Sequence, residues 1–352
     1  MKPLVINQVN PLPIEYLSPN LEYSGGEIIK EPVVNEELLI ARRAAEAHRR
    51  SRYKIQSEIK PGMTLNEICT IIESSTRILL KGEKNDGIGF PTGVSINECA
   101  AHFTTIPGAE EIYLKESDVL KIDFGTHVDG RIMDSAFTIC FDPQFENLLL
   151  ASKESMEEGI KAAGVDVRVC DIGERIGEVI SSYELTLNGK NEKIIPVSNL
   201  NGHSIGKYEI HSGISIPITK NEDQTRLKED RFYAIETFAT TGRGLAKDGD
   251  FFTHYILDQN VSKHLINEDT KRVYKCISEK IGTLPFCQRY VDYILQENNY
   301  SNESIEYLTK NNILIPFEPH YENEGAYVAQ FEHTIYLSSN GGKEIVSRGE
   351  DY

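Results

Sequence analysis

The sequence of 352 residues is poor in basic side chains and contains no long hydrophobic run. It carries 37 Lys and Arg against 54 Asp and Glu, a formal net charge of −17. Nucleic-acid binders need basic side chains to displace counterions from phosphates, so a general nucleic-acid-binding protein is excluded. No run of about 18 apolar residues occurs, and residues 1–20 lack the apolar core of a signal peptide. We therefore expect no membrane-spanning helix and a cytoplasmic location.

Cysteine is also scarce. The six cysteines lie at positions 69, 99, 140, 170, 276 and 287, and no two of them form a CxxC pair. This density is far below that of a disulfide scaffold, and zinc sites built from thiolates need closely spaced pairs. The pattern predicts reduced cysteines and no zinc site made of thiolates.

What the sequence does contain is typical of an ordinary globular protein with a large core. Hydrophobic residues make up 39% and charged residues 26%, and the length suggests either two domains or one large domain with an insertion. Five of the 14 prolines fall within residues 1–32. We expect residues 1–35 to form an extended N-terminal arm.

Two pairs of predicted helices show the same pattern about 110 residues apart. The first pair begins at the candidate N-cap Asn35, with a Leu-rich start at 38–41, and resumes at a T-x-x-E capping box at 64–67. The second pair has a Leu-rich start at 148–151 and a D-x-x-E box at 171–174. The repetition predicts one domain made of two related halves, although such helix starts also recur by chance.

Strand-like segments lie between these helices, and a different kind of segment follows them. Residues 255–316 are richer in Lys, Asn and Glu and show helical spacing of apolar residues, which predicts a helical insertion. The four predicted strands are Val119–Val128, Arg131–Ile139, Phe232–Phe238 and Tyr327–Leu337.

Each of these four strands is interrupted by a carboxylate: Asp123, Asp134, Glu236 and Glu332. Burying an unpaired carboxylate costs several kcal/mol, so each requires a cation or a dense set of hydrogen bonds. A single such residue is as well explained by a half-exposed strand position, but four together indicate a common site.

The turn at Asp129-Gly130 fixes how the first two acids lie. It predicts a two-residue type I′ hairpin, in which Gly125 pairs with Asp134 and Asp123 pairs with Ala136. Asp123 and Asp134 then share one face as diagonal neighbours, about 7–8 Å apart at Cα. Carboxylates held in this way can bind two cations, which in co-catalytic pairs lie about 3.5–4 Å apart. A single ion or a salt bridge to Arg is the alternative.

Three histidines have a context that fits such a site: His102, His203 and His211. The other six (His48, His127, His254, His264, His320 and His333) are expected to be surface or packing residues. Residues 202–206, GHSIG, also match the nucleophile elbow of α/β-hydrolases, with Ser204 as nucleophile. That elbow needs a helix after it, whereas a strand or loop is predicted here, so we do not favour it.

The constellation resembles the type 2 methionine aminopeptidases. This family has a pita-bread fold, an α/β (α+β) arrangement of two pseudo-symmetric halves around a dinuclear metal site, which agrees with the duplication above. The resemblance makes residues 36–352 the catalytic domain, with the helical insertion at about 255–316. It is carried by GIGFPTGVSINECAAHF (87–103), KIDFGTHVDGRIMDSAFT (121–138), NLNGHSIGKYEIHSG (199–213), FYAIETFATTGRG (232–244), AQFEHTI (329–335) and SRGEDY (347–352).

The resemblance implies a metal site for two divalent ions: Co, Mn, Fe or Zn. In the family's pattern Asp134 and Glu332 bridge the ions. Asp123 completes the ligands of one ion, and His203 and Glu236 complete those of the other. By the same resemblance, the catalytic residues are His102, His211 and Glu236.

The implied activity is removal of the N-terminal methionine from nascent polypeptides with a small second residue. Glu236 would move the proton of the attacking water, His211 would stabilise the oxyanion, and His102 would help the amine to leave. His102 is also the residue that fumagillin-type epoxides would alkylate. The implied substrate pocket consists of Phe90, His102, Ile210, His211, Phe238 and His254, completed by Phe317 or Tyr321.

The resemblance also bears on partners. Some eukaryotic members carry a long charged N-terminal extension linked to ribosome association, whereas here the expected arm is short and proline-rich. We expect a monomer with transient ribosome proximity, and no nucleic-acid or membrane partner. The alternatives are a prolidase-like enzyme that cleaves X-Pro bonds and a non-catalytic binding protein of the same fold. The segments NGHSIG and AQFEHT and the late insertion argue against the first, and the five intact ligands and the acidic surface argue against the second.

Overall fold

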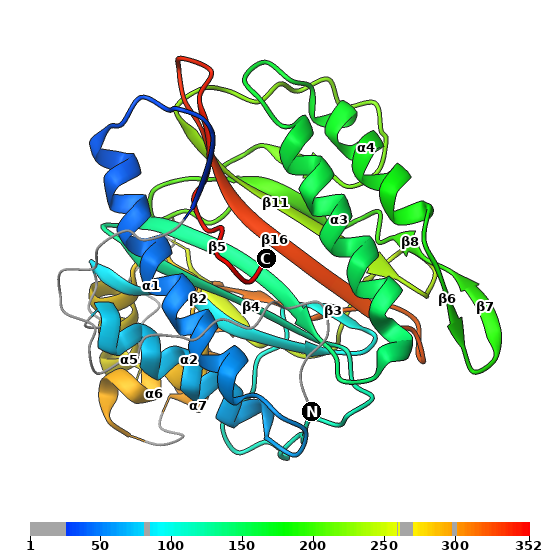
Figure 1. Cartoon of the computed structure of the whole chain (residues 1–352). Helices are drawn as coiled ribbons and strands as arrows, with labels where there is room; N and C mark the ends of the chain where they lie inside the picture. Colours follow the sequence, from blue (N-terminus) through cyan, green and yellow to red (C-terminus); the bar gives the residue numbers. More distant parts are fainter. Residues whose placement is uncertain (1–25, 81–84, 259, 261–269, 298–300) are drawn as a thin grey trace.

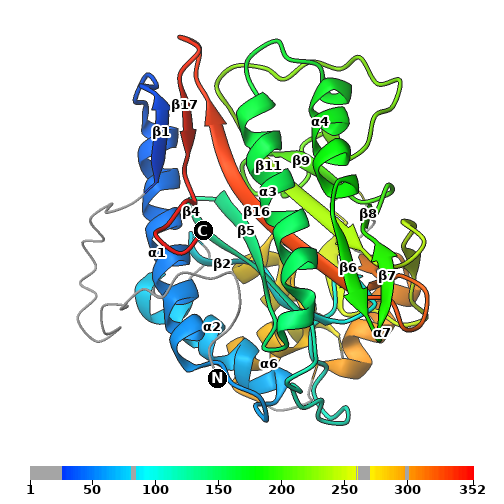
Figure 2. The same ribbon diagram turned by 45° about the vertical axis from the view of Figure 1, so that its right-hand side comes forward.

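The computed structural model describes residues 26–80, 85–258, 260, 270–297 and 301–352 (Figure 1). His264 and most of the expected N-terminal arm, residues 1–25, lie outside this range. Within it the chain forms five sheets, of which two meet at the centre of the molecule, and helices cover one face of these two (Figures 1 and 2).

The first sheet is built around the predicted hairpin. β4 (Leu120–Val128) and β5 (Arg131–Ile139) pair with Gly125 opposite Asp134 and Asp123 opposite Ala136, so the predicted register is confirmed. Asp129 and Gly130 have φ of 46° and 74°, the positive values that a type I′ turn requires. The sequence reasoning missed β2 (Asp86–Ile96), which pairs antiparallel with β4.

The second sheet has seven strands in the order β1-β17-β16-β11-β9-β10, and β8 pairs with β11. Its centre is the antiparallel pair β11 and β16, in which Glu236 lies opposite Glu332. β1, from the expected N-terminal arm, joins the edge of this sheet beside β17 (Figure 2). The strands are β1 (Glu27–Lys30), β8 (Ile195–Pro196), β9 (Asn201–Ile205), β10 (Ser215–Pro217), β11 (Arg231–Thr240), β16 (Val328–Leu337) and β17 (Lys343–Ile345).

Two threonines join the sheets along the seam between β5 and β16. Thr138 Oγ1 donates to the carbonyl of Gln330 (2.7 Å) and accepts from its amide (2.7 Å). Thr334 Oγ1 makes the same two bonds with the main chain of Asp134, at 2.7 and 3.1 Å. Each half therefore supplies one threonine hydroxyl that bonds the main chain of the other half, where backbone-to-backbone hydrogen bonds would otherwise join the strands. This symmetry agrees with two related halves.

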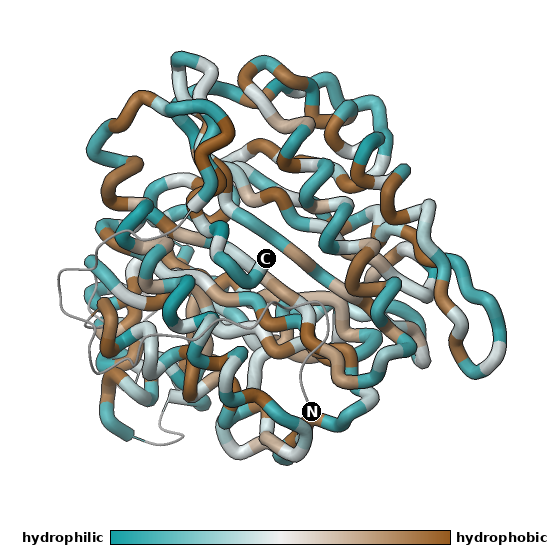
Figure 3. Tube along the Cα trace, viewed as in Figure 1, coloured by the Kyte–Doolittle hydropathy of each residue, from teal (hydrophilic) through white to brown (hydrophobic). Residues whose placement is uncertain are grey.

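The helices repeat the same arrangement on each half. α1 (Glu36–Glu58) packs on β4 and β5 and is capped by the Asn35 side chain as predicted, while α3 (Glu146–Ala162) packs on β11 and β16. Hydrophobic and hydrophilic residues alternate along α3 (Figure 3), as expected of a helix with one buried face. α2 (Leu65–Leu80) follows the predicted capping box, whose two bonds measure 2.7 and 3.0 Å.

The predicted capping box at 171–174 is wrong. α4 (Val169–Ser181) begins two residues earlier, and Asp171 lies in its first turn. The Asp171 carboxylate accepts two hydrogen bonds from the Arg168 guanidinium, both at 2.7 Å, instead of capping the helix. A nearby arginine competed for the carboxylate, which the sequence pattern alone did not reveal.

In the segment predicted as a helical insertion, the residues that the structure describes form three α-helices, and they pack against the first half. β13 (His254–Leu257) and β14 (Leu314–Phe317) pair at its base. Among the described residues, no helix has the length and apolarity that crossing a membrane requires. The remaining elements are α5 (Lys271–Cys276), a π-helical turn (Ile277–Ile281), α6 (Gln288–Leu295), α7 (Asn302–Lys310), β3 (Cys99–Ala101), β12 (Lys247–Asp248), β15 (His320–Tyr321), β6 (Glu184–Leu187), β7 (Lys190–Lys193) and the short 3-10 turn Pro143–Phe145.

Candidate metal centre and its pocket

The four strand carboxylates lie together where the two sheets meet. Asp123 and Asp134 come from β4 and β5, and Glu236 and Glu332 come from β11 and β16. Asp134, Glu236 and Glu332 are buried, and Asp123 is partly buried. Side chains alternate along a strand, so the pairing of β4 with β5 and of β11 with β16 places the two acids of each strand pair on the same face of its sheet.

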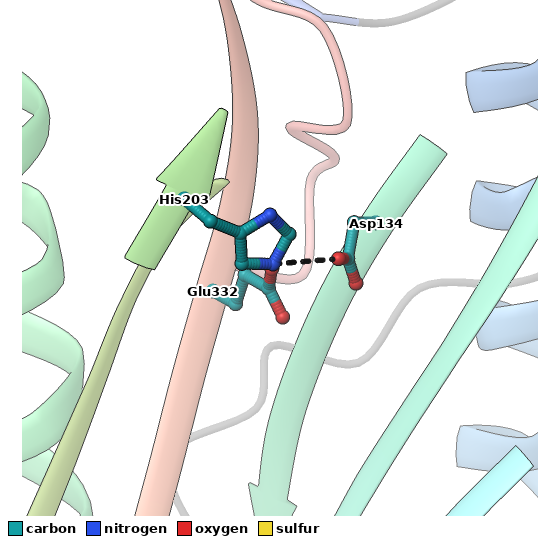
Figure 4. A group of neighbouring side chains, drawn as sticks. All are labelled: Asp134, His203 and Glu332. Atoms are coloured by element: carbon teal, nitrogen blue, oxygen red, sulfur yellow. Dashed lines mark ion pairs between the residues drawn. The ribbon is translucent and has the colours of Figure 1, made fainter. Parts of the chain in front are cut away.

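His203 completes this cluster from β9. Its Nε2 lies 3.5 Å from Asp134 Oδ2 and 3.6 Å from Glu236 Oε1. One ligand atom each of Asp134, His203 and Glu332 lies within 4.8 Å of the others (Figure 4). Burial, and next the neighbouring His211, lower the pKa of His203, so that it is a neutral imidazole able to bind a metal.

The cluster brings four carboxyl groups together, and among the described residues no Lys or Arg forms an ion pair with any of them. Burial raises the pKa of Asp123 to about 7. Burial, and then the charges of Asp123 and Glu236, raise the pKa of Asp134 well above its usual value. The pKa values of Glu236 and Glu332 are raised for the same two reasons, burial first and neighbouring carboxylates second.

Unpaired oxygen atoms show that these residues fit a cation. Asp123 Oδ1, Asp134 Oδ1 and Glu332 Oε1 are buried without a hydrogen-bond partner among the described residues. Buried polar atoms are normally satisfied, and carboxylate oxygens with one imidazole are a suitable ligand set for divalent transition metals. The arrangement therefore fits metal ions better than a salt bridge to Arg.

Gln330 is a site residue that the sequence reasoning missed. Its Nε2 donates to Asp123 Oδ2 (3.1 Å) and to Glu236 Oε2 (3.3 Å), and so links one acid of each half. Its position two residues before Glu332 on the same strand could have revealed it, because such residues share a face.

A cavity of about 100 Å³ opens beside the carboxylates. His102 and His211 both line it. His211 is exposed, and its ring centroid lies 4.1 Å from that of His203. His102 has φ of 61° and is held at its carbonyl by Thr253 Oγ1 (2.6 Å). The full lining is Phe90, Pro91, Gly93, His102, Asp123, Asp134, His203, Ile210, His211, Glu236, His254, Ile256, Pro285, Phe317 and Glu332.

The structure separates the apolar candidates of the pocket. Phe90 and Ile210 line the cavity, and so does Phe317, whereas Tyr321 does not. Phe238 does not line it either, because its side chain is buried in the main hydrophobic core.

The predicted insertion also contributes to the pocket, through Ile256 and Pro285, which no spacing in the sequence indicated. His254, which the resemblance assigned to the substrate pocket, lines the cavity. His320 was expected to be a surface or packing residue, but its ring centroid lies 4.7 Å from that of His102, and it pairs with Asp248 at 2.9 Å.

Ser204 does not form a nucleophile elbow. It lies within β9, fully buried, and its Oγ accepts hydrogen bonds from Ser212 Oγ (2.9 Å) and the Ile214 amide (3.0 Å). All six cysteines are free, as predicted, and all six are buried.

Comparisons with known proteins agree with this geometry. The model of metallopeptidase family M24 matches residues 40–268. Methionine aminopeptidase 2 of Encephalitozoon hellem is 52% identical over 359 residues, covering all of both chains. Among solved structures, a thermophilic Arx1 (TM-score 0.75, 16% identity, 91% of this chain and 95% of that one) and a methionine aminopeptidase from Thermotoga maritima (TM-score 0.60, 19% identity, 91% and 99%) share the fold. The chain belongs to metallopeptidase family M24 and, within it, to the type 2 methionine aminopeptidases.

Proposed function

We propose that this protein is a metalloaminopeptidase that releases the N-terminal methionine of nascent proteins and peptides. The observation that carries the proposal is the cluster of four carboxylates and His203 beside an apolar cavity, in which all but Asp123 are buried. The relatives that match its full length are named methionine aminopeptidase 2.

Two divalent ions would be held by Asp123, Asp134, His203, Glu236 and Glu332. Five protein ligands, of which two carboxylates can bridge, suit a pair of ions better than one. When bound, such ions polarise the scissile carbonyl and make a water molecule nucleophilic near neutral pH. Carboxylates with one imidazole accept Co, Mn, Fe or Zn, so the metal in the cell depends on availability.

The remaining steps belong to the protein's own side chains. Glu236 is the group that takes up the proton of the attacking water, because its carboxylate lines the cavity beside the other ligands, where burial and the charge of Asp123 raise its pKa. His211, at the open edge of the cavity, donates to the developing oxyanion. The proton that Glu236 takes from the water passes to the departing amine, and His102 contacts the scissile amide and helps this transfer.

The cavity supports methionine as the residue removed. Phe90, Ile210, Ile256 and Phe317 provide an apolar wall for an unbranched thioether side chain, and His254 supplies a polar group within it. Because the cavity is small, the second residue of the substrate must be small as well.

The proposal extends to where the enzyme works. We place it in the cytoplasm as a monomer, with transient proximity to the ribosome, where new N-termini emerge. The excess of acidic over basic residues supports the absence of nucleic-acid binding.

Assays of methionine release from Met-Ala-Ser and Met-Pro peptides test the function. The protein is assayed before chelation, after chelation, and after addition of Co(II), Mn(II), Fe(II) or Zn(II). We expect release that chelation abolishes and at least one metal restores. Cleavage of an Ala-Pro dipeptide without methionine release would instead indicate a prolidase.

Two variants distinguish the loss of a metal ligand from a general effect of removing a negative charge. Asp134→Asn removes a buried ligand and should lower kcat by at least 100-fold, while circular dichroism shows an intact fold. Glu324→Gln neutralises an exposed acid and should leave activity unchanged. Full activity of Asp134→Asn, or release that is insensitive to chelators, would contradict the metal mechanism.

A further inference from the structure

Residues 347–352 pass behind the metal centre, on the helix-covered face of the sheets. Figure 1 shows this segment over β5 and β16, between α1 and α3. Side chains alternate along a strand, so Ser135 and His333 point to this face while their neighbours Asp134 and Glu332 point to the site. Tyr352, which is 4% exposed, contacts both Ser135 and His333.

One chain of hydrogen bonds runs from Tyr352 across the seam. Ser135 Oγ donates to the carbonyl of Glu332 (2.7 Å), which uses its one hydrogen. The Tyr352 hydroxyl, 2.8 Å from Ser135 Oγ, must therefore be the donor of that bond. The Tyr352 hydroxyl thus orients Ser135, which follows Asp134 on β5, for its hydrogen bond to the main chain of Glu332 on β16.

A second set of bonds holds the other side of the ring. His333 Nε2 lies 3.2 Å from the main-chain oxygen of Tyr352, which accepts, so the histidine carries its hydrogen there. His333 Nδ1 then accepts from Ser347 Oγ (2.8 Å), which itself accepts from the Thr334 amide (2.9 Å). The rings of His333 and Tyr352 stack with centroids 4.6 Å apart.

An ion pair fixes this segment to α1. Arg52 Nε and one terminal nitrogen donate to the two oxygens of Asp351 at 2.5 and 2.7 Å, and both side chains are fully buried. The Arg52 guanidinium also lies 4.5 Å from the centroid of the Tyr352 ring. The position of Tyr352 is therefore set by α1 and by both sheets at once.

We propose that Tyr352 is a positioning residue for the metal centre, because its hydroxyl, through Ser135, fixes the spacing between the β5 strand that carries Asp134 and the β16 strand that carries Glu332. This inference rests on the proposed function only in taking these two carboxylates as metal ligands. Partners behind metal ligands typically change metal affinity about 10- to 100-fold when they are removed. Since Tyr352 acts through the backbone, we expect the lower end of that range.

Metal binding by full-length protein tests the proposal without reference to activity. After chelator treatment, Mn(II) is titrated and the free ion is counted by electron paramagnetic resonance, and Co(II) is added separately to record its visible spectrum. Tyr352→Phe should weaken Mn(II) binding about tenfold and change the Co(II) spectrum. Ser135→Ala should do the same, and the double variant should lose less than the product of the two effects, because both act through one chain of bonds.

Tyr336→Phe is the matched control. Tyr336 is buried on the same strand as Glu332, but its hydroxyl bonds Asp230 (2.9 Å) and Asn35 (2.8 Å), away from the seam. It should bind Mn(II) like the wild type. The proposal is overturned if Tyr352→Phe and Ser135→Ala bind Mn(II) with wild-type affinity and an unchanged Co(II) spectrum, or if Tyr336→Phe is weakened equally. Failure of the wild type to release methionine while it binds Mn(II) would count against the proposed function, and these comparisons would still decide the role of Tyr352.

Discussion

The variant Gln330→Met tests the side-chain amide that donates a hydrogen bond to one acid from each half of the site, Asp123 and Glu236. Methionine keeps the length and approximate volume of glutamine but cannot donate to Asp123 or Glu236. Gln330 is 1% exposed, so the lost bonds are not replaced by bulk water. In the metal-bound enzyme both carboxylates are ionised, and the variant leaves them with fewer donors.

The expected size of the effect follows from these contacts. A hydrogen bond to a charged group contributes about 1.5–3 kcal/mol. The two bonds of Gln330 are long, at 3.1 and 3.3 Å, so we take them together as roughly one good bond, about 2 kcal/mol. That corresponds to about 30-fold weaker metal binding.

The loss should also depend on pH. Gln330 lowers the pKa of Asp123 and of Glu236, so its removal lets protons compete better for both groups. Metal binding requires the deprotonated forms, and the deficit of the variant should therefore grow as the pH falls below about 7.

Mn(II) titration at pH 8.0 and 6.5 measures both effects. Gln288→Met is the matched control, because Gln288 is also buried and bonds a carboxylate, Asp292 at 3.4 Å, outside the site. The reasoning is refuted if Gln330→Met binds Mn(II) within about threefold of the wild type at both pH values, or if the control shows the same loss.

Three further predictions concern stability and the pocket. His48 is buried and burial lowers its pKa well below 6.5, so the unfolded state binds more protons and stability falls as the pH drops below 6.5. The free energy of unfolding, measured with urea at pH 7.0 and 5.5, should fall over this range by about 1.3 kcal/mol less for His48→Gln than for the wild type. An equal fall in the two proteins would contradict this prediction. Asp351→Asn leaves Arg52 buried without its ionic partner and should lower the free energy of unfolding, measured by calorimetry, by about 3–5 kcal/mol. The double variant Arg52→Met/Asp351→Leu should recover most of this stability. In Gly125→Ala the added Cβ would lie 2.3 Å from the Phe90 ring, so the ring should be driven into the cavity. The KM for methionyl peptides should then rise about tenfold, while the affinity for Mn(II) stays unchanged. An unchanged KM would show that the ring moves elsewhere.

The local features of the sequence were predictable because they depend on neighbouring residues. The turn at Asp129-Gly130 dictated the hairpin register, and the structure confirms it. The caps at Asn35 and at 64–67 are likewise confirmed, since each involves residues three apart. The box at 171–174 failed because Arg168, equally near in sequence, was the stronger partner of Asp171.

The candidate site was predictable in part. Carboxylates in apolar strands are costly, so their positions alone indicated a shared cation site. Sequence context made His203 one of three candidate histidines, and the family resemblance assigned it as a ligand. Gln330 contacts Asp123 across 207 positions of the sequence, and no local pattern shows such a contact. Ile256 and Pro285 reach the cavity only because the inserted segment folds back on the first half, and only the structure decides between Phe317 and Tyr321.

The sequence by itself therefore determined the hairpin, the caps and the identity of the acids, whose energies depend on turns, alternation and the cost of buried charge. Only the tertiary structure decided how the two halves are spaced. That spacing depends on Thr138 and Thr334 at the seam and on the Tyr352–Ser135 contact, which spans 217 positions. The physical reason is that a metal centre needs ligands placed to within a fraction of an ångström, and hydrogen bonds between distant segments set distances at that scale.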